Sequence, residues 1–206
     1  IGRSGFESLE RKFGGVKFMQ NVKTIEPLIS IYDLEALPDD GNIYELFEGE
    51  LSVAKAPSLK HQELIGRFVT ILNNYLDQNP IGRVWLTPGV IFDEYNSAIP
   101  DLVFISSERI NRIASGIHIV GAPDLVIEIL SPGSENVRRD QVVKRQTYAR
   151  FGVKEYWICE PVLEFIEISR LQNNVLASAG VLRNAEEMSS PLLPDLKFAV
   201  NDVFRK

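Results

Sequence analysis

The chain has 206 residues, 45% of them hydrophobic, a length that suffices for one well-buried domain and is short for two. Its single cysteine and two histidines exclude a disulfide framework and a zinc site of the His/Cys type. No apolar stretch approaches the roughly 20 residues of a membrane span. We therefore expect a cytoplasmic protein with no membrane partner. A net charge of −6 argues against non-specific coating of nucleic acid, because such binding depends on clustered lysine and arginine.

The first half of the chain predicts a leader, a hairpin and a long helix. Residues 1–18 are rich in glycine and charge, and we expect a flexible leader there, followed by one domain at 19–206. Residues 31–37 predict a short helix, and residues 44–53 predict two strands joined by a tight turn. The pattern then predicts a helix from Ser58, its N-cap, to about residue 79.

The buried face of that helix is indicated by apolar residues at helical spacing, namely Ile65, Phe68, Leu72 and Leu76. Further elements follow from apolar runs bounded by turn residues. We expect strands within 83–93, broken near residues 88–89, and at 102–105, 125–130, 153–159, 163–169 and 175–182. Helices are expected at 106–113 and 136–151, and turns at 39–41 and 132–133. This order favours an α/β fold in which helices flank a mixed β-sheet.

Two carboxylates stand out against this background. Asp101 follows a proline at the start of one predicted strand, and Glu128 lies inside the apolar run 125–130. A buried ionised carboxylate needs a cation or a proton, and two carboxylates that face one cavity suit a divalent metal ion. The alternatives are that Asp101 only begins a strand and that Glu128 forms an ion pair with a basic neighbour in the core.

The following helix carries further polar residues on one face. Asp140, Lys144 and Tyr148 recur every four residues, so Lys144 can bring an ammonium group towards the carboxylates, while Tyr148 is expected to pack rather than react. The alternative for Lys144 is an exposed ion pair with Asp140. The same region holds a local excess of basic residues, which either contact a polyanion or form a solvated helix face: Arg138, Arg139, Lys144, Arg145, Arg150 and Lys154.

A larger set of motifs extends over roughly residues 30–170 in one order: YELFEGEL at 44–51, residues 57–58 with His61, PDL at 100–102, APDLVIEILSP at 122–132, Asp140 with Lys144 and Tyr148, and GVKEYW at 152–157. In this combination the chain resembles the Uma-two family of restriction-endonuclease-like proteins, in the PD-(D/E)XK nuclease superfamily. The resemblance implies a restriction-endonuclease-like core with extra β-strands.

The resemblance also implies an activity and a site. It predicts a Mg²⁺-dependent endonuclease, with Mn²⁺ as a substitute, in which Asp101 and Glu128 hold the metal and the catalytic residues are Asp101, Glu128, Lys144 and Glu45. The superfamily pattern places a lysine two residues after the second acid, where this chain has Leu130, so we expect Lys144 to replace it. Glu45 matches the first motif, whose acid completes the metal shell in such proteins.

His61 and Glu50 are weaker candidates. His61 is in register with the apolar face of its helix, so it is either a core histidine or a group that orients a phosphate, and its place at a helix N-terminus favours the neutral form. The expected partner is nucleic acid, most simply DNA, and paired cuts on two strands favour a homodimer. The alternative function is a non-catalytic nucleic-acid-binding or regulatory module that keeps the nuclease fold.

Overall fold

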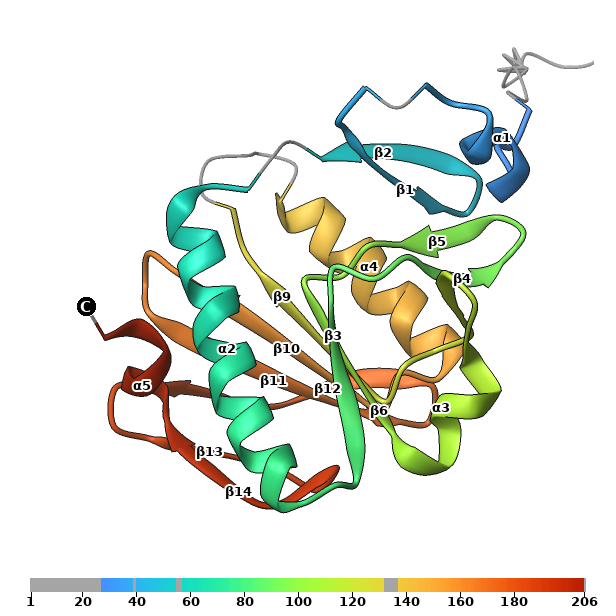
Figure 1. Ribbon diagram of the computed structural model, residues 1–206. Coiled ribbons are helices and arrows are strands. Elements are labelled where there is room, and N and C mark those ends of the chain that lie inside the picture. Colours follow the sequence, from blue (N-terminus) through green and yellow to red (C-terminus); the bar gives the residue numbers. More distant parts are fainter. Residues whose placement is uncertain (1–26, 39, 55–56, 132–136, 206) are drawn as a thin grey trace, which may run out of the picture.

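The computed structural model describes residues 27–38, 40–54, 57–131 and 137–205. The expected leader at 1–18, residue 39, the expected turn at 132–133 and the expected helix start at 136 lie outside these ranges. At the centre is a six-stranded sheet whose strand order is β12-β11-β10-β9-β6-β3 (Figure 1). Its strands are β3 (Gly82–Leu86), β6 (Leu102–Ser106), β9 (Leu125–Ile129), β10 (Glu155–Glu160), β11 (Phe165–Gln172) and β12 (Val175–Arg183).

This main sheet is mixed, as expected. β9 and β10 run parallel, and the other neighbouring pairs are antiparallel. One face is covered by the long helix α2 (Leu59–Gln78), the short helix α5 (Val200–Phe204) and the hairpin of β13 (Glu187–Ser190) and β14 (Leu193–Ala199). The α/β class with a mixed sheet between helices is therefore confirmed.

The other face of the main sheet is covered by α4 (Val137–Phe151) and by a second, smaller sheet in the order β2-β1-β5-β4-β8-β7. In Figure 1, α2 lies in front of the main sheet and α4 behind it, with the β1–β2 hairpin above. The remaining elements are α1 (Ile31–Glu35), β1 (Ile43–Phe47), β2 (Glu50–Ala54), β4 (Val90–Asp93), β5 (Asn96–Ala98), α3 (Ser107–Ile113), β7 (Ala114–Ser115) and β8 (His118–Val120).

Strand β9 lies at the middle of the molecule and is buried on both faces. Leu125 and Ile127 pack into the core on the α2 side, whereas Val126 packs into the core on the α4 side. Because side chains alternate along a strand, Glu128 also faces α4. The continuous apolar run that predicted this strand is typical of a strand with a parallel neighbour.

Local signals account for the ends of several elements. The Ser58 side chain accepts a hydrogen bond from the His61 backbone N–H and so caps α2. Glu48 and Gly49 both have positive φ, 53° and 76°, which is the backbone shape of the tight turns that match strand twist in hairpins. Gly152, with φ 90°, follows the last residue of α4, where a left-handed residue commonly ends a helix.

Two details differ from the expectation. The fully buried residue in the second turn of α2 is Leu64, and the predicted Ile65 is only half-buried, because the face turned to the sheet runs through His61, Leu64 and Phe68. Several short elements had no recognisable sequence signal. Strands of two to four residues are too short to show a period, and β14 is interrupted by Pro194 and by Asp195 at φ 63°. The unpredicted elements are β5, β7, β8, β13, β14 and α5.

A buried carboxylate stands just before β9. Asp124 has no solvent-exposed surface, accepts a hydrogen bond from the Ser106 N–H at 2.9 Å, and forms ion pairs with Arg109 at 2.8 Å and Lys154 at 2.7 Å. Burial alone would raise the pKa of Asp124, but these donors and charges outweigh it and lower that pKa below its ordinary value. The start of β9 is therefore fixed by a fully compensated acid.

Candidate active site

The predicted metal ligands come together at the other end of β9. β6 and β9 are antiparallel with Leu102 opposite Ile127, and continuing this register by one residue places Asp101 opposite Glu128. The backbone N–H of Ile129 donates to Asp101 Oδ2 at 2.7 Å, which ties the acid that precedes β6 to the end of β9. Asp101 thus does more than begin a strand.

Lys144 reaches this end of the sheet from α4. Its Nζ donates to Glu128 Oε1 at 3.1 Å and to Glu45 Oε1 at 3.0 Å. Glu45, on β1, is buried and also accepts the Ile99 backbone N–H at 3.0 Å. Only 17% of the Lys144 side chain is exposed, so the alternative of an exposed ion pair is wrong; the side chain of its proposed partner, Asp140, lies outside the described residues.

Tyr148 is the site residue that sequence reasoning missed. Its hydroxyl donates to Glu128 Oε1 at 2.8 Å, and the residue is fully buried. The four-residue spacing from Lys144 to Tyr148 was a usable signal, because it places both donors on the helix face that meets β9. The ring does pack, as expected, and contacts Phe92 and Tyr156 at centroid distances of 5.8 and 5.3 Å.

His61 joins the cluster from the opposite face of the sheet. Its Nε2 lies 3.2 Å from Asp101 Oδ2, and its Nδ1 is buried with no hydrogen-bond partner among the described residues. The expectation of a pKa biased towards the neutral form by the helix N-terminus is wrong. Burial does lower the pKa of His61, but the contact with and charge of Asp101, the backbone of Ile129 and the charge of Glu128 together raise it more.

The charges of the cluster are only partly balanced. Burial raises the pKa of Glu128 to about 7, Lys144 opposes this rise, and Asp101 and Glu45 add to it. Burial would lower the pKa of Lys144, but Glu128 and Glu45 outweigh burial and raise it, so the ammonium stays charged. The Lys144 ammonium therefore faces the carboxylates of Glu45 and Glu128, and Asp101 adds a further negative charge. The alternative in which Glu128 forms an ion pair with a basic neighbour is thus present, but this one cation does not neutralise the site.

The hydrogen bonds leave a regular pattern of oxygens. The Ile129 N–H donates to Asp101 Oδ2 and His61 Nε2 lies beside the same oxygen, while both donors to Glu128, from Lys144 and Tyr148, meet Oε1. Within the described ranges, no donor meets Asp101 Oδ1 or Glu128 Oε2. Among the described residues, each acid therefore has one oxygen that meets no hydrogen-bond donor.

This donor set fits Mg²⁺. Among residues 27–38, 40–54, 57–131 and 137–205, no group of three or more His, Cys, Asp and Glu side chains is placed to hold a metal ion. Two carboxylate oxygens are nevertheless what Mg²⁺ commonly takes from a protein, because it keeps several waters and binds substrate phosphate with the rest of its octahedral shell. Asp101 and Glu128 are the residues that would hold it.

Other sequence candidates stand outside the cluster. Glu50, at the start of β2, is exposed. The basic excess of the α4 region is largely matched by acids: Arg145 pairs with Glu167 at 2.7 Å, and Lys154 pairs with Asp124. Arg150 pairs with Glu48, and the side chains of residues 138 and 139 lie outside the described part of the chain.

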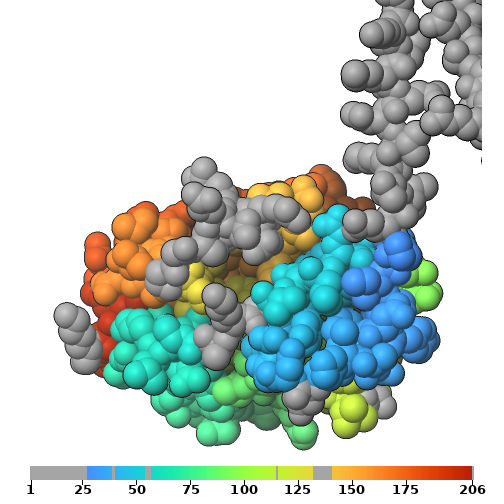
Figure 2. Space-filling model, turned by 90° about the horizontal axis from the view of Figure 1, so that it is seen from above, coloured from blue at the N-terminus to red at the C-terminus, as the bar shows by residue number. Residues whose placement is uncertain are grey.

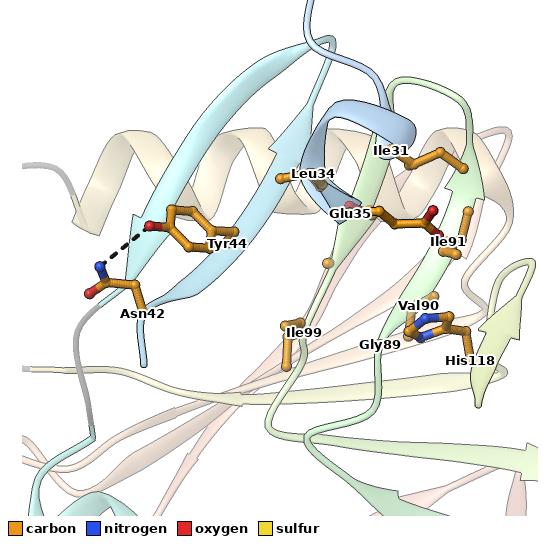
Figure 3. Close-up of a pocket in the computed structure, with 12 residues that line it drawn as sticks. Ile31, Leu34, Glu35, Asn42, Tyr44, Gly89, Val90, Ile91, Ile99 and His118 are labelled. Carbon is orange, nitrogen blue, oxygen red and sulfur yellow. Dashed lines mark hydrogen bonds between the residues drawn. The ribbon is translucent and has the colours of Figure 1, made fainter. Parts of the chain in front are cut away.

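A separate cavity of about 260 Å³ lies on the small sheet (Figure 3). Its lining includes Tyr44, Ile99 and His118. It includes none of the residues of the carboxylate cluster, which are Glu45, His61, Asp101, Glu128, Lys144 and Tyr148. Tyr44 and Glu45 are neighbours on β1 and point to opposite faces, so the cavity and the carboxylates lie on either side of that strand. This cavity is thus distinct from the cluster of carboxylates and lysine.

Three parts of the chain surround the carboxylate end of the sheet. Seen from above in Figure 2, the first turns of α2 in green, the β1–β2 hairpin in cyan and α4 in yellow and orange lie side by side around the end of β9. Across the described residues, no helix has both the length and the hydrophobicity that a membrane crossing requires.

A mixed sheet between helices, with two acids and a lysine gathered at one end, is the arrangement of a nuclease-like protein. The crystal structure described as "a putative nuclease belonging to DUF820 from Anabaena variabilis ATCC 29413" has a similar fold: the TM-score is 0.71 at 23% sequence identity, over 85% of this chain and 97% of that chain. The chain itself belongs to the Uma2 family, described as "Putative restriction endonuclease", which matches residues 31–201. No curated protein matches the sequence.

Proposed function

We propose that this protein is a metal-dependent endonuclease that hydrolyses phosphodiester bonds in DNA. The nuclease class rests on the family and the fold, and the single observation that carries the reaction is the cluster of Asp101, Glu128 and Lys144 at the end of β9. Two acids, each with one oxygen that meets no donor in the described part of the chain, beside a lysine whose pKa is raised, suit the binding of a divalent cation and a phosphate.

Asp101 and Glu128 would hold Mg²⁺, or Mn²⁺ as a substitute. When bound, such an ion lowers the pKa of a water ligand and offsets the charge of the phosphate. Backbone and helix donors hold the two acids in place, since Ile129 and His61 contact Asp101 and Tyr148 contacts Glu128. These contacts limit the motion of both acids before the ion binds.

Lys144 supplies positive charge next to the phosphate position. Because the neighbouring carboxylates raise its pKa, the lysine remains an ammonium and stabilises negative charge that develops on the phosphoryl oxygens, rather than acting as a base. Glu45 holds this lysine through Oε1, and the Ile99 N–H holds Glu45. In this role Lys144 replaces the lysine that the superfamily pattern places at Leu130.

One observation favours the alternative of a non-catalytic module. Arg145, Arg150 and Lys154 are paired with acids, which leaves them less available for the DNA backbone. A protein that binds metal or nucleic acid without cutting would fit this balance.

The two functions separate in one experiment. Mn²⁺ and Mg²⁺ binding is measured by calorimetry, and cleavage is followed on linear, supercoiled and single-stranded DNA, for the wild type and for Asp101→Asn and Glu128→Gln. The control is Glu187→Gln, which changes an exposed acid on β13 that pairs with Lys197. We expect binding and cleavage in the wild type and the control, and neither in the site variants. Metal binding without cleavage of any substrate supports the non-catalytic module, and an absence of binding contradicts the metal site.

A further inference from the structure

We propose that His61 and Tyr148 are positioning residues that fix the orientation in which the Asp101 and Glu128 carboxylates face the metal ion. This inference rests on the proposed function, because it assumes that Asp101 and Glu128 bind a divalent cation. Neither residue would touch the substrate. Each acts through the acid that it contacts, and the two come from helices on opposite faces of the main sheet.

Two contacts on one oxygen orient the Asp101 carboxylate. A carboxylate can turn about its last side-chain bond with little preference, and turning changes the direction in which its oxygens point. The Ile129 N–H donates to Oδ2 at 2.7 Å and His61 Nε2 lies 3.2 Å from the same oxygen, so turning the carboxylate plane would lengthen both contacts. The second oxygen, which meets no donor among the described residues, is thereby held in one direction.

The His61 contact is not what stability alone would favour. Nδ1 is buried without a hydrogen-bond partner in the described part of the chain, and an unsatisfied buried polar atom costs about 1–3 kcal/mol. The residue lies on the apolar face of α2 with Leu64 and Phe68, where an aliphatic side chain would avoid that cost. The imidazole is therefore better explained by its contact with Asp101 than by packing.

Tyr148 gives the same argument on the other face. Its ring packs against Phe92 and Tyr156, and a phenylalanine would make those contacts equally well. The hydroxyl adds one interaction, the hydrogen bond to Glu128 Oε1, which lies on the oxygen that Lys144 also contacts. Glu128 is thus oriented through one oxygen, as Asp101 is, and its Oε2 meets no donor among the described residues.

Outer-shell partners of metal ligands typically contribute 10–100-fold to metal affinity. Mn²⁺ affinity, measured by calorimetry at a single pH, is therefore the readout. Tyr148→Phe and His61→Leu should each weaken Mn²⁺ binding by about tenfold. His61→Gln should stay within about threefold of the wild type, because the glutamine amide nitrogen reaches the position of Nε2 and keeps the donor.

The matched control is Tyr75→Phe. Tyr75 also lies on α2, and its hydroxyl donates to the Pro194 backbone carbonyl at 2.6 Å, away from the cluster. This variant removes a tyrosine hydrogen bond without touching either acid, so Mn²⁺ affinity should not change. Circular dichroism establishes that all four variants are folded before their affinities are compared.

Each outcome decides the inference. Wild-type affinity in both Tyr148→Phe and His61→Leu would overturn it while leaving the proposed metal site intact. If His61→Gln is folded and as weak as His61→Leu, packing of the ring and not its donor matters, and the role of His61 is refuted. If the wild type itself does not bind Mn²⁺, the proposed function fails together with the positioning role.

Discussion

Replacing Glu128 by glutamine should change how the stability of the protein depends on pH. In the absence of divalent cations, burial raises the pKa of Glu128 from 4.5 to about 7, with Lys144 opposing the rise and Asp101 and Glu45 adding to it. Glutamine has nearly the same shape but does not titrate. The comparison therefore isolates the proton that Glu128 takes up.

The sign follows from the raised pKa. Between pH 4.5 and about 7 the folded state holds a proton at Glu128 that the unfolded state has lost, so the free energy of unfolding falls as the pH rises. This contribution to stability is complete below the pKa of Glu128 in the unfolded state, and it is lost as the pH rises through the pKa of Glu128 in the folded state. At about 1.4 kcal/mol for each pKa unit, the full range corresponds to about 3 kcal/mol.

Urea unfolding in EDTA at pH 5 and pH 8 measures the effect. We expect the wild type to lose most of this 3 kcal/mol relative to Glu128→Gln between the two conditions, because other titrating groups cancel in the difference. Glu187→Gln, at an exposed acid, should follow the wild type. If wild type and Glu128→Gln show the same pH dependence, Glu128 does not take up a proton in this range and the description of an under-compensated acid is refuted.

Three further predictions concern the reaction, the core and the assembly. Lys144→Ala should lower turnover by about tenfold or more, Lys144→Arg should recover little, and Leu130→Lys should partly rescue Lys144→Ala. Normal turnover of Lys144→Ala would eliminate the role of the lysine. Phe68→Ala should destabilise the protein by about 3–5 kcal/mol in urea unfolding, because Phe68 is fully buried against Trp157 and Phe198; a loss under 1 kcal/mol would contradict this core position. Light scattering at micromolar concentration should report a homodimer, and a monomer mass would refute that prediction.

Elements with local signals could be predicted from the sequence. The Ser58 cap, the turn at Glu48 and Gly49, and the end of α4 at Gly152 each depend on one or two neighbouring residues. Short strands such as β5 and β8 could not be predicted, because three residues show no period and their formation depends on distant partners.

The site divides in the same way. Glu128 could be identified because an acid within an apolar run is unusual, and Asp101 because it begins the neighbouring strand. The contacts from His61 to Asp101 and from Tyr148 to Glu128 join residues 40 and 20 positions apart, so they depend on how α2 and α4 pack on the sheet. A periodic pattern can place these residues on a helix face, but it cannot name their partners.

The two acids of strand β9 also indicate where the protein can exchange ions with its surroundings. Asp124, before the strand, has both Arg109 and Lys154 as partners and a lowered pKa, so its charge is already matched by resident cations. Glu128, near the end of the strand, shares Lys144 with Glu45 and has a raised pKa. Binding of a proton or metal ion from solution is therefore more favourable at Glu128 than at Asp124. The start of the strand does not respond to ions in solution, whereas its end does.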